Sequence, residues 1–409
     1  MEVMYARCAG LDVHPASVVA CARHAEGPRV QRTLERFGTT TQELLRLADW
    51  LEQHGCTHVA MESSGVYWKP VWHVLEGRFE LVLANAMHIR NIPGRKSDMN
   101  DATWIADLLA HGLIRGSLVP PTPIRALRDL TRARKQLVRE RAQHVQRIQK
   151  VLEDANIKLT GVVSDVLGQS GRAILEAMVA GEDDPERLLA HAGSRLKASH
   201  AVLVEALRGQ VTDHHRFMLR LHLEQVDSLE RAITALERRA EELLSPFRTE
   251  VERLTTMPGI SSTAAHVIVA EIGLDMSRFP SAGHLRSWVG LCPRLDVSAG
   301  KRLSNRTRRG CPWLKTLLVQ AAWAAVRHRE GYLHAQFLRL KSRRGPKKAI
   351  LAVAASMLSG MFFILRDQVD YRDLGGDHFH RRDRERLARR LVRRLHELGL
   401  EVHVKTVAA

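Results

Sequence analysis

Residues 7–37, RCAGLDVHPASVVACARHAEGPRVQRTLERF, decide the fold of the N-terminal region. They contain three β-rich runs, Arg7–Val13, Ser17–His24 and Val30–Phe37, and short turns with Pro or Gly separate these runs. This pattern predicts three consecutive strands that form an antiparallel meander.

The sequence after this meander alternates between helical and strand patterns. Leucines at helical spacing predict a helix over Thr41–His54, capped by Thr40 or Thr41. Further strands are predicted at Thr57–Met61 and Glu80–Ala84, and further helices at Val66–Leu75 and Ser97–Leu109. Three antiparallel strands followed by alternating helices and strands is the order of an RNase H-like fold. We therefore expect an α/β domain of this kind over residues 1–118.

A proline-rich break, Pro120-Pro121-Thr122-Pro123, ends this pattern, and residues 124–249 are predicted to be a helical domain. Apolar residues recur there every seven positions, which predicts a coiled coil within one chain or between chains. The two positions of the repeat are occupied by Leu219, Val226, Ile233 and Ala240, and by His222, Leu229, Leu236 and Leu243.

Residues 250–409 are predicted to form a third, mainly α-helical domain. The turn Pro258-Gly259-Ile260-Ser261 lies between two helical patterns and resembles a helix-hairpin-helix, whose amides can hold a DNA phosphate. Ser261 replaces the second glycine, which weakens the motif if the turn needs a positive φ there. Leu291–Thr307 is expected to be a polar loop, and the apolar stretch Ala349–Leu365 is interrupted by polar residues and predicted to be a buried helix, so we expect no membrane association.

The composition favours a polyanionic partner. The chain has 409 residues with 62 Lys and Arg against 45 Asp and Glu, a net charge of +17, and this field attracts nucleic acid. Five cysteines without a C-x-x-C pair argue against a disulfide framework or a zinc ribbon, and no secretion signal is visible, so a cytoplasmic protein is expected. The basic residues that we expect to contact nucleic acid are Arg132, Arg134, Lys135, Arg139, Lys301, Arg302, Arg306, Arg308 and Arg309.

Four acidic residues are candidates for a metal site. Asp12 and Glu62 end predicted strands that are neighbours in an RNase H-like sheet, and Asp98 and Asp101 lie three residues apart at the start of a helix. A single acid of this kind is more often a solvated charge or a helix cap. Four that converge suit Mg²⁺ or Mn²⁺, which prefer oxygen ligands and assist phosphodiester cleavage.

Several motifs together resemble one large family of insertion-sequence transposases. The strings GLDVH (10–14), AMESSGVYW (60–68) and GRKSDMNDATWIADLLAHGLI (94–114) are similar to the family's N-terminal DEDD, RuvC-like domain. Its C-terminal transposase domain is matched by TTMPGI (255–260), EIGLDMSRFPSAGHLRSWVGLCPR (271–294), VSAGKR (297–302) and TRRGCPWLKTLLVQAAWAAVR (307–327). The family comprises recombinases guided by an element-encoded bridge RNA that pairs with donor and target DNA.

The resemblance implies roles for individual residues. Asp12, Glu62, Asp98 and Asp101 fall on the four metal-binding acids, and Ser298 falls on the serine that forms a covalent link to DNA. The predicted coiled coil and a site shared by the two halves favour an oligomer, a dimer that pairs into a tetramer on two DNA duplexes. In such a composite site, Asp12 and Ser298 of different subunits would act at one phosphate. On the residues alone, Ser298 is an ordinary loop serine, and Ser262 and Ser304 compete with it.

Two other functions stay open. A metal-dependent nuclease of the Holliday-junction resolvase type would use only the acids and water, so that Ser298→Ala would leave cleavage intact. A non-catalytic nucleic-acid scaffold, built on the coiled coil and the basic faces, predicts that Asp12→Ala and Glu62→Ala have no effect except on the charge.

Overall fold

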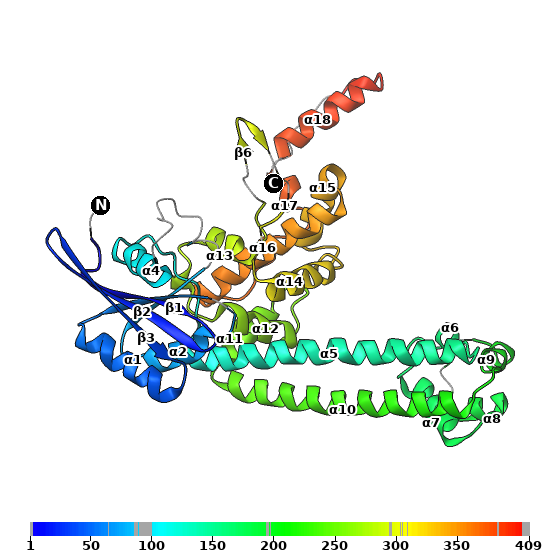
Figure 1. Ribbon diagram of the computed structural model, residues 1–409. Helices are drawn as coiled ribbons and strands as arrows, with labels where there is room; N and C mark the ends of the chain where they lie inside the picture. The colour runs from blue at the N-terminus through cyan, green and yellow to red at the C-terminus, as the bar shows by residue number, and fades with distance from the viewer. Residues whose placement is uncertain are drawn as a thin grey trace. The chain divides into compact units, whose positions relative to one another are not determined.

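The computed structural model divides the chain into two compact units, Met1–Val119 and Pro120–Ala409, called here the N-terminal and C-terminal units (Figure 1). It describes residues 3–63, 65–85, 89, 100–193, 196, 198–293, 297–302, 304, 306–308, 310–382 and 384–402.

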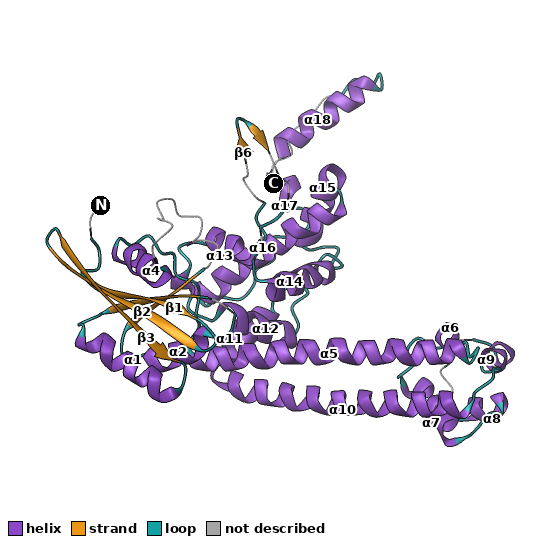
Figure 2. Ribbon diagram, viewed as in Figure 1, coloured by secondary structure: helices purple, strands orange, loops and turns teal. Residues whose placement is uncertain are grey.

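The N-terminal unit contains a five-stranded sheet in the order β3-β2-β1-β4-β5. Its strands, orange in Figure 2, are β1 (Arg7–Val13), β2 (Ser17–Glu26), β3 (Arg29–Gly38), β4 (His58–Glu62) and β5 (Glu80–Ala84). The first three are antiparallel, whereas β4 pairs in parallel with β1, and β5 with β4. The five predicted strands are confirmed, with ends that differ by no more than about two residues.

Helices cover both faces of this sheet because successive strand side chains point to opposite sides. They are α1 (Thr41–Gln53), α2 (Trp68–Leu75) and α4 (Asp101–Ala110). Leu11 and Val13 of β1 lie in one apolar cluster with α1 and α2, whereas Cys8 lies in another cluster with α4. A Cβ on Gly10 would lie 2.3 Å from the carbonyl oxygen of Ala102, so glycine lets α4 approach β1 closely.

The C-terminal unit begins with a long helical hairpin, α5 (Thr122–Asp154) and α10 (Asp213–Leu244). The two helices run antiparallel, side by side (Figure 1), and ion pairs such as Arg141–Glu230 join them. Positions of the predicted heptad repeat are buried, including Leu219 and Val226. The described structure therefore places this pairing within one chain. Short helices follow α5: α6 (Leu159–Val162), α7 (Gln169–Ala180), α8 (Pro185–Ala190) and α9 (His200–Ala206).

In the rest of the C-terminal unit, several helices pack around α16 (Pro346–Asp367). Its other elements are η1 (Ser245–Phe247), α11 (Arg248–Thr255), α12 (Ser262–Ile272), η2 (Met276–Arg278), α13 (Ala282–Val289), β6 (Val297–Ser298), β7 (Lys301–Arg302), α14 (Pro312–Ala325), α15 (Tyr332–Arg344), α17 (His378–Arg382) and α18 (Arg384–Glu397). Among the described residues, α16 is the one helix long and apolar enough to cross a membrane, and 56% of its apolar window is buried in the fold. It is therefore the predicted buried helix.

Two local expectations are wrong. Leu291–Thr307 is not only a loop, since β6 and β7 form a short antiparallel hairpin whose turn residues Ala299 and Gly300 have φ of 47° and 75°. Ser261 does not strain its turn either, because its φ is −84° and the positive φ belongs to Gly259. The Ser261 side chain accepts a hydrogen bond from the amide of Ala264 and so caps α12.

Candidate functional site

Asp12 and Glu62 lie at the same edge of the sheet. The parallel pairing of β1 with β4 brings Leu11 opposite Met61, and each acid is the next residue along its strand. Ala60, two residues before Glu62, lies in the apolar cluster with α4, and Gly10, two residues before Asp12, contacts α4. Because strand side chains alternate, both acids belong to the α4 face of the sheet.

Asp101 reaches the same edge from α4. The Sγ of Cys8 contacts the carbonyl oxygen of Ala106 at 3.6 Å, and Gly10 is packed against Ala102, so α4 runs antiparallel to β1. The first residue of α4 is Asp101. The residue before it, Asn100, caps the helix, because its side-chain oxygen accepts a hydrogen bond from the amide of Ala102. The start of α4 therefore lies toward the end of β1 that bears Asp12.

Asp98, the fourth predicted acid, lies outside the described residues, as does Ser97, at which the helix was expected to begin. Within the part of the chain that the structure describes, no group of three or more His, Cys, Asp or Glu is close enough to hold a metal ion. The acids at this edge supply only carboxylate oxygens, which is the donor type that Mg²⁺ and Mn²⁺ prefer. The donor chemistry therefore fits such an ion.

His14 is an unexpected neighbour of this edge. Its Nε2 lies 3.1 Å from Oδ2 of Asp12, whose side chain is 23% exposed. The amide of His14 donates to the carbonyl of Ser17, which closes the turn from β1 to β2 and holds the imidazole two residues beyond the carboxylate. From the sequence, the position of His14 just after the strand-end Asp12 suggests a fifth ligand, but a surface histidine beside the turn at Pro15 is the preferred interpretation.

Asp107, which lies six residues after Asp101 in the sequence, has a structural role. Its carboxylate accepts hydrogen bonds from Arg23 at 2.9 Å and from Arg32 at 3.0 Å, and the Arg23 side chain is 3% exposed. These arginines belong to β2 and β3, so the contacts fix α4 to the sheet.

Ser298 lies at the end of β6, where its backbone pairs with Lys301 across the two-residue turn. Basic residues surround this hairpin in sequence: Lys301, Arg306 and Arg308 are exposed, Arg302 belongs to β7, and Arg309 lies outside the described residues. The two competing serines have their own partners. Ser262 lies 3.2 Å from Nε2 of His266, and Ser304 accepts from the amide of Arg306.

Several basic residues of α5 contact other helices of the C-terminal unit. Arg134 donates to Glu237, as Arg141 does to Glu230, so these two arginines join α5 to α10. Lys135 and Arg139 instead lie close to the indole ring of Trp313 on α14.

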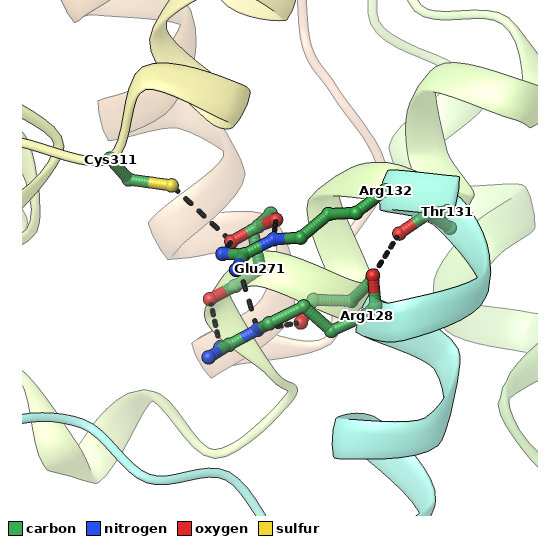
Figure 3. Close-up of polar contacts among 6 residues, drawn as sticks. Arg128, Thr131, Arg132, Glu271 and Cys311 are labelled. Atoms are coloured by element: carbon green, nitrogen blue, oxygen red, sulfur yellow. Dashed lines mark hydrogen bonds and ion pairs between the residues drawn. The ribbon is translucent and has the colours of Figure 1, made fainter. Parts of the chain in front are cut away.

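Figure 3 shows a buried ion-pair network that sequence analysis did not find. Glu271 of α12 is 1% exposed, and its carboxylate accepts two hydrogen bonds of 2.8 Å from Arg132. Arg128 donates to the carbonyl oxygens of Ala270 and Glu271, and the Sγ of Cys311 lies 3.3 Å from the same carboxylate. The signal in the sequence was the single acid in the apolar helix STAAHVIVAEI.

The five cysteines are free thiols, and three of them, Cys8, Cys21 and Cys56, are buried. Burial raises the pKa of the Cys8 thiol to about 11 and that of Cys56 to about 12. These thiols are therefore protonated at neutral pH and take part in packing.

Comparison with known proteins identifies domains at both ends of the chain. Residues 9–157 match the DEDD domain of IS110-type elements, described as "Transposase", and residues 251–338 match the family described as "Transposase IS116/IS110/IS902 family". The first match contains Asp12, Glu62, Asp98 and Asp101, and the second contains Ser298.

Two curated proteins are similar to this chain. A "Probable family 20 transposase" of Pseudomonas aeruginosa is 26% identical over 286 residues, which are 69% of this chain and 75% of that protein. The "Insertion element IS110 uncharacterized 43.6 kDa protein" of Streptomyces coelicolor is 29% identical over 155 residues, 36% of this chain and 38% of that protein.

Proposed function

We propose that this chain, which carries IS110-family transposase domains, cuts and rejoins the DNA of an insertion sequence. The observation that carries the proposal is the presence of both transposase domains in one chain, with the predicted acids in the first and the predicted serine in the second. The net charge of +17 supports DNA as the substrate, because cationic surfaces gain entropy when they release the counterions of nucleic acid.

We assign an RNase H-like fold to the N-terminal unit. The support is the strand order β3-β2-β1-β4-β5, with an antiparallel meander followed by two parallel strands. In this fold Asp12 and Glu62 end the two adjacent central strands, where a phosphodiester can approach both carboxylates.

Asp12, Glu62, Asp98 and Asp101 would hold a divalent metal, Mg²⁺ or Mn²⁺. When bound, the ion would neutralise charge on the scissile phosphate and lower the pKa of a bound hydroxyl. The carboxylates would place this ion at one edge of the sheet, and the imidazole of His14 lies within hydrogen-bond distance of Asp12.

The second part of the reaction is assigned to Ser298. Its hydroxyl oxygen attacks the scissile phosphorus, a new O–P bond forms, and the bond from phosphorus to a deoxyribose oxygen breaks. The serine loses its proton, and the leaving oxygen takes one up. Attack on this phosphoserine diester by a hydroxyl of another strand reverses these steps and rejoins the DNA without ATP, because the diester bond is conserved. Cations near the hairpin, including Lys301 and Arg306, would stabilise the developing charge.

The resemblance to bridge-RNA-guided recombinases extends this proposal to a guide RNA that selects donor and target DNA. It also extends it to a dimer that forms a tetramer on two DNA duplexes, and to action in the prokaryotic cytoplasm, where the chromosome lies.

The experiment is strand cleavage of labelled element-end DNA by wild type and four variants, with the element's flanking RNA and Mg²⁺. Asp12→Asn, Glu62→Gln and Ser298→Ala are each expected to lower cleavage at least about 100-fold, and EDTA to abolish it. Ser304→Ala serves as the matched control and is expected to cleave normally. Full cleavage by Ser298→Ala would favour the metal-dependent nuclease. DNA binding without cleavage in wild type and in the acid variants alike would favour a non-catalytic scaffold.

A further inference from the structure

Three cationic side chains of α5 surround one indole ring. The Nζ of Lys135 lies 5.1 Å from the ring centroid of Trp313, and the Cζ atoms of Arg132 and Arg139 lie 5.5 and 5.9 Å from it. Trp313 is the second residue of α14, directly after Pro312. The negative face of an indole attracts cations, so the ring gathers these side chains at one place.

Only one of the three charges is neutralised. Arg132 pairs with the carboxylate of Glu271, as Figure 3 shows, whereas Lys135 and Arg139 have no carboxylate partner in the part of the chain that the structure describes. Like charges so close together repel one another, and Lys135 is also half-buried. The fold therefore keeps two cations together without an internal counter-ion.

The pKa of Lys135 is lowered in this group of cations. Burial lowers the pKa of its ammonium group, and the charge of Arg139 lowers it further; Cys311 and Glu271 act in the opposite direction but more weakly. An anion bound between Lys135 and Arg139 would remove the repulsion.

The start of α14 adds to the positive potential. Trp313 is the second residue of α14, so the cations at its ring lie near the N-terminus of this helix. The thiol of Cys311, the residue before α14, contacts Glu271. A helix of 14 residues has a partial positive charge at this end, which favours phosphate.

We propose that Lys135 and Arg139, held by the ring of Trp313, bind a backbone phosphate of the nucleic acid on which this protein acts. The inference rests on the proposed function. It reduces the number of candidate phosphate ligands on α5, because Arg134 and Arg141 already form ion pairs with Glu237 and Glu230. Lys135 and Arg139, gathered at one ring, are thus the proposed phosphate ligands of α5, and Trp313 is a positioning residue.

The test is the salt dependence of binding to a DNA duplex and to an RNA hairpin, compared between two double variants. Lys135→Gln/Arg139→Gln removes the proposed site, and Arg147→Gln/Lys150→Gln removes the same charge from exposed positions further along α5. Each phosphate contact contributes about 0.9 to the slope of log affinity against log salt for B-DNA and about 0.7 for single strands. The first variant is expected to lose about one to two such contacts relative to the second. A slope that is reduced with only the DNA duplex or only the RNA hairpin identifies which of the two the site binds. Equal slopes of the two double variants with both nucleic acids would overturn the proposal.

Two substitutions of Trp313 distinguish a positioning role from a general loss of folding. Trp313→Phe keeps an aromatic face and is expected to retain the wild-type slope, whereas Trp313→Leu is expected to lower it with an unchanged circular dichroism spectrum. Covalent adduct formation at saturating DNA keeps the two proposals apart. Wild type that binds DNA without forming an adduct would count against the proposed function alone. Equal salt slopes of the two double variants, with an adduct formed by wild type, would count against the phosphate site alone.

Discussion

Glu271 shows how a single residue can join several helices. Its buried carboxylate on α12 pairs with Arg128 and Arg132 of α5 and contacts Cys311 before α14. Burying one charge without its partner is costly, so each member of the network depends on the others. Arg132 was predicted to contact nucleic acid because it lies in a basic stretch of the sequence. Its ion pair with a carboxylate 139 positions away could not be predicted from spacing.

Glu271→Gln is therefore expected to destabilise the C-terminal unit. The two guanidinium groups lose their counter-charge while Arg128 stays largely buried, which should lower the free energy of unfolding by about 3–5 kcal/mol. Urea unfolding followed by circular dichroism measures it. The control is Glu252→Gln, whose pair with Arg248 is exposed and should matter by less than about 1 kcal/mol. Equal effects of the two changes would contradict this role of Glu271.

His222 gives a second prediction, for pH. It is buried at a heptad position of α10, its ring lies 5.3 Å from that of His144 on α5, and its pKa is lowered from 6.5 by burial, then by His144 and Arg147. The folded state thus prefers neutral His222, whereas the unfolded chain binds the proton more readily. This contribution to stability is present above pH 6.5 and is lost as the pH falls through the folded-state pKa.

The measurement compares urea midpoints at about pH 8 and about pH 5 for wild type, His222→Leu and His200→Leu. His222→Leu should reduce the loss of stability at low pH, while replacement of the exposed His200 should not. The same change of the urea midpoint with pH in all three proteins would show that protonation of His222 does not affect the stability of the hairpin.

At the scale of elements, the strands were predictable because each carries its own periodicity, and β5 was predicted with both ends correct. The hairpin of β6 and β7 was not, since two strands of two residues have no period to detect. The partner of the heptad pattern in α10 is α5, and only the folded chain identifies it. The placement of Asp12 and Glu62 at one edge followed from the strand order, which is why their juxtaposition could be predicted.

The contact between β1 and α4 gives a prediction for an element. In Gly10→Ala the new Cβ would lie 2.3 Å from the carbonyl oxygen of Ala102 and 2.4 Å from the amide nitrogen of Ala106, so α4 must move away from β1. The variant should lose about 1–3 kcal/mol of stability and most DNA cleavage, because Asp101 starts α4. Hydrogen exchange of β1 peptides reports the first effect, and Gly116→Ala, which meets only Val82 at 3.6 Å, is the control. Unchanged exchange and cleavage in Gly10→Ala would contradict this packing role.

At the scale of the whole molecule, the two units differ in the side chains that they supply for chemistry. The N-terminal unit offers carboxylates at one edge of a sheet, and the C-terminal unit offers a serine on a short hairpin and cations on α5. Asp12 and Glu62 could be placed on neighbouring strands from the predicted strand order, whereas their role as metal ligands stays a prediction. Ser298 could not be assigned in this way, because a serine beside a turn has many ordinary uses, and its assignment depends on the resemblance to transposases.

The central claim is that Ser298 becomes covalently attached to DNA. The most direct measurement is to form the adduct with wild-type protein, digest it with nuclease and trypsin, and locate the remaining nucleotide by mass spectrometry. Cleavage after Arg294 and Lys301 releases residues 295–301, LDVSAGK, in which Ser298 is the only hydroxyl residue. The account predicts a nucleotide on this peptide, and none in Ser298→Ala. A nucleotide on the peptide that contains Ser262 or Ser304, or DNA cleaved with no modified peptide, would contradict it.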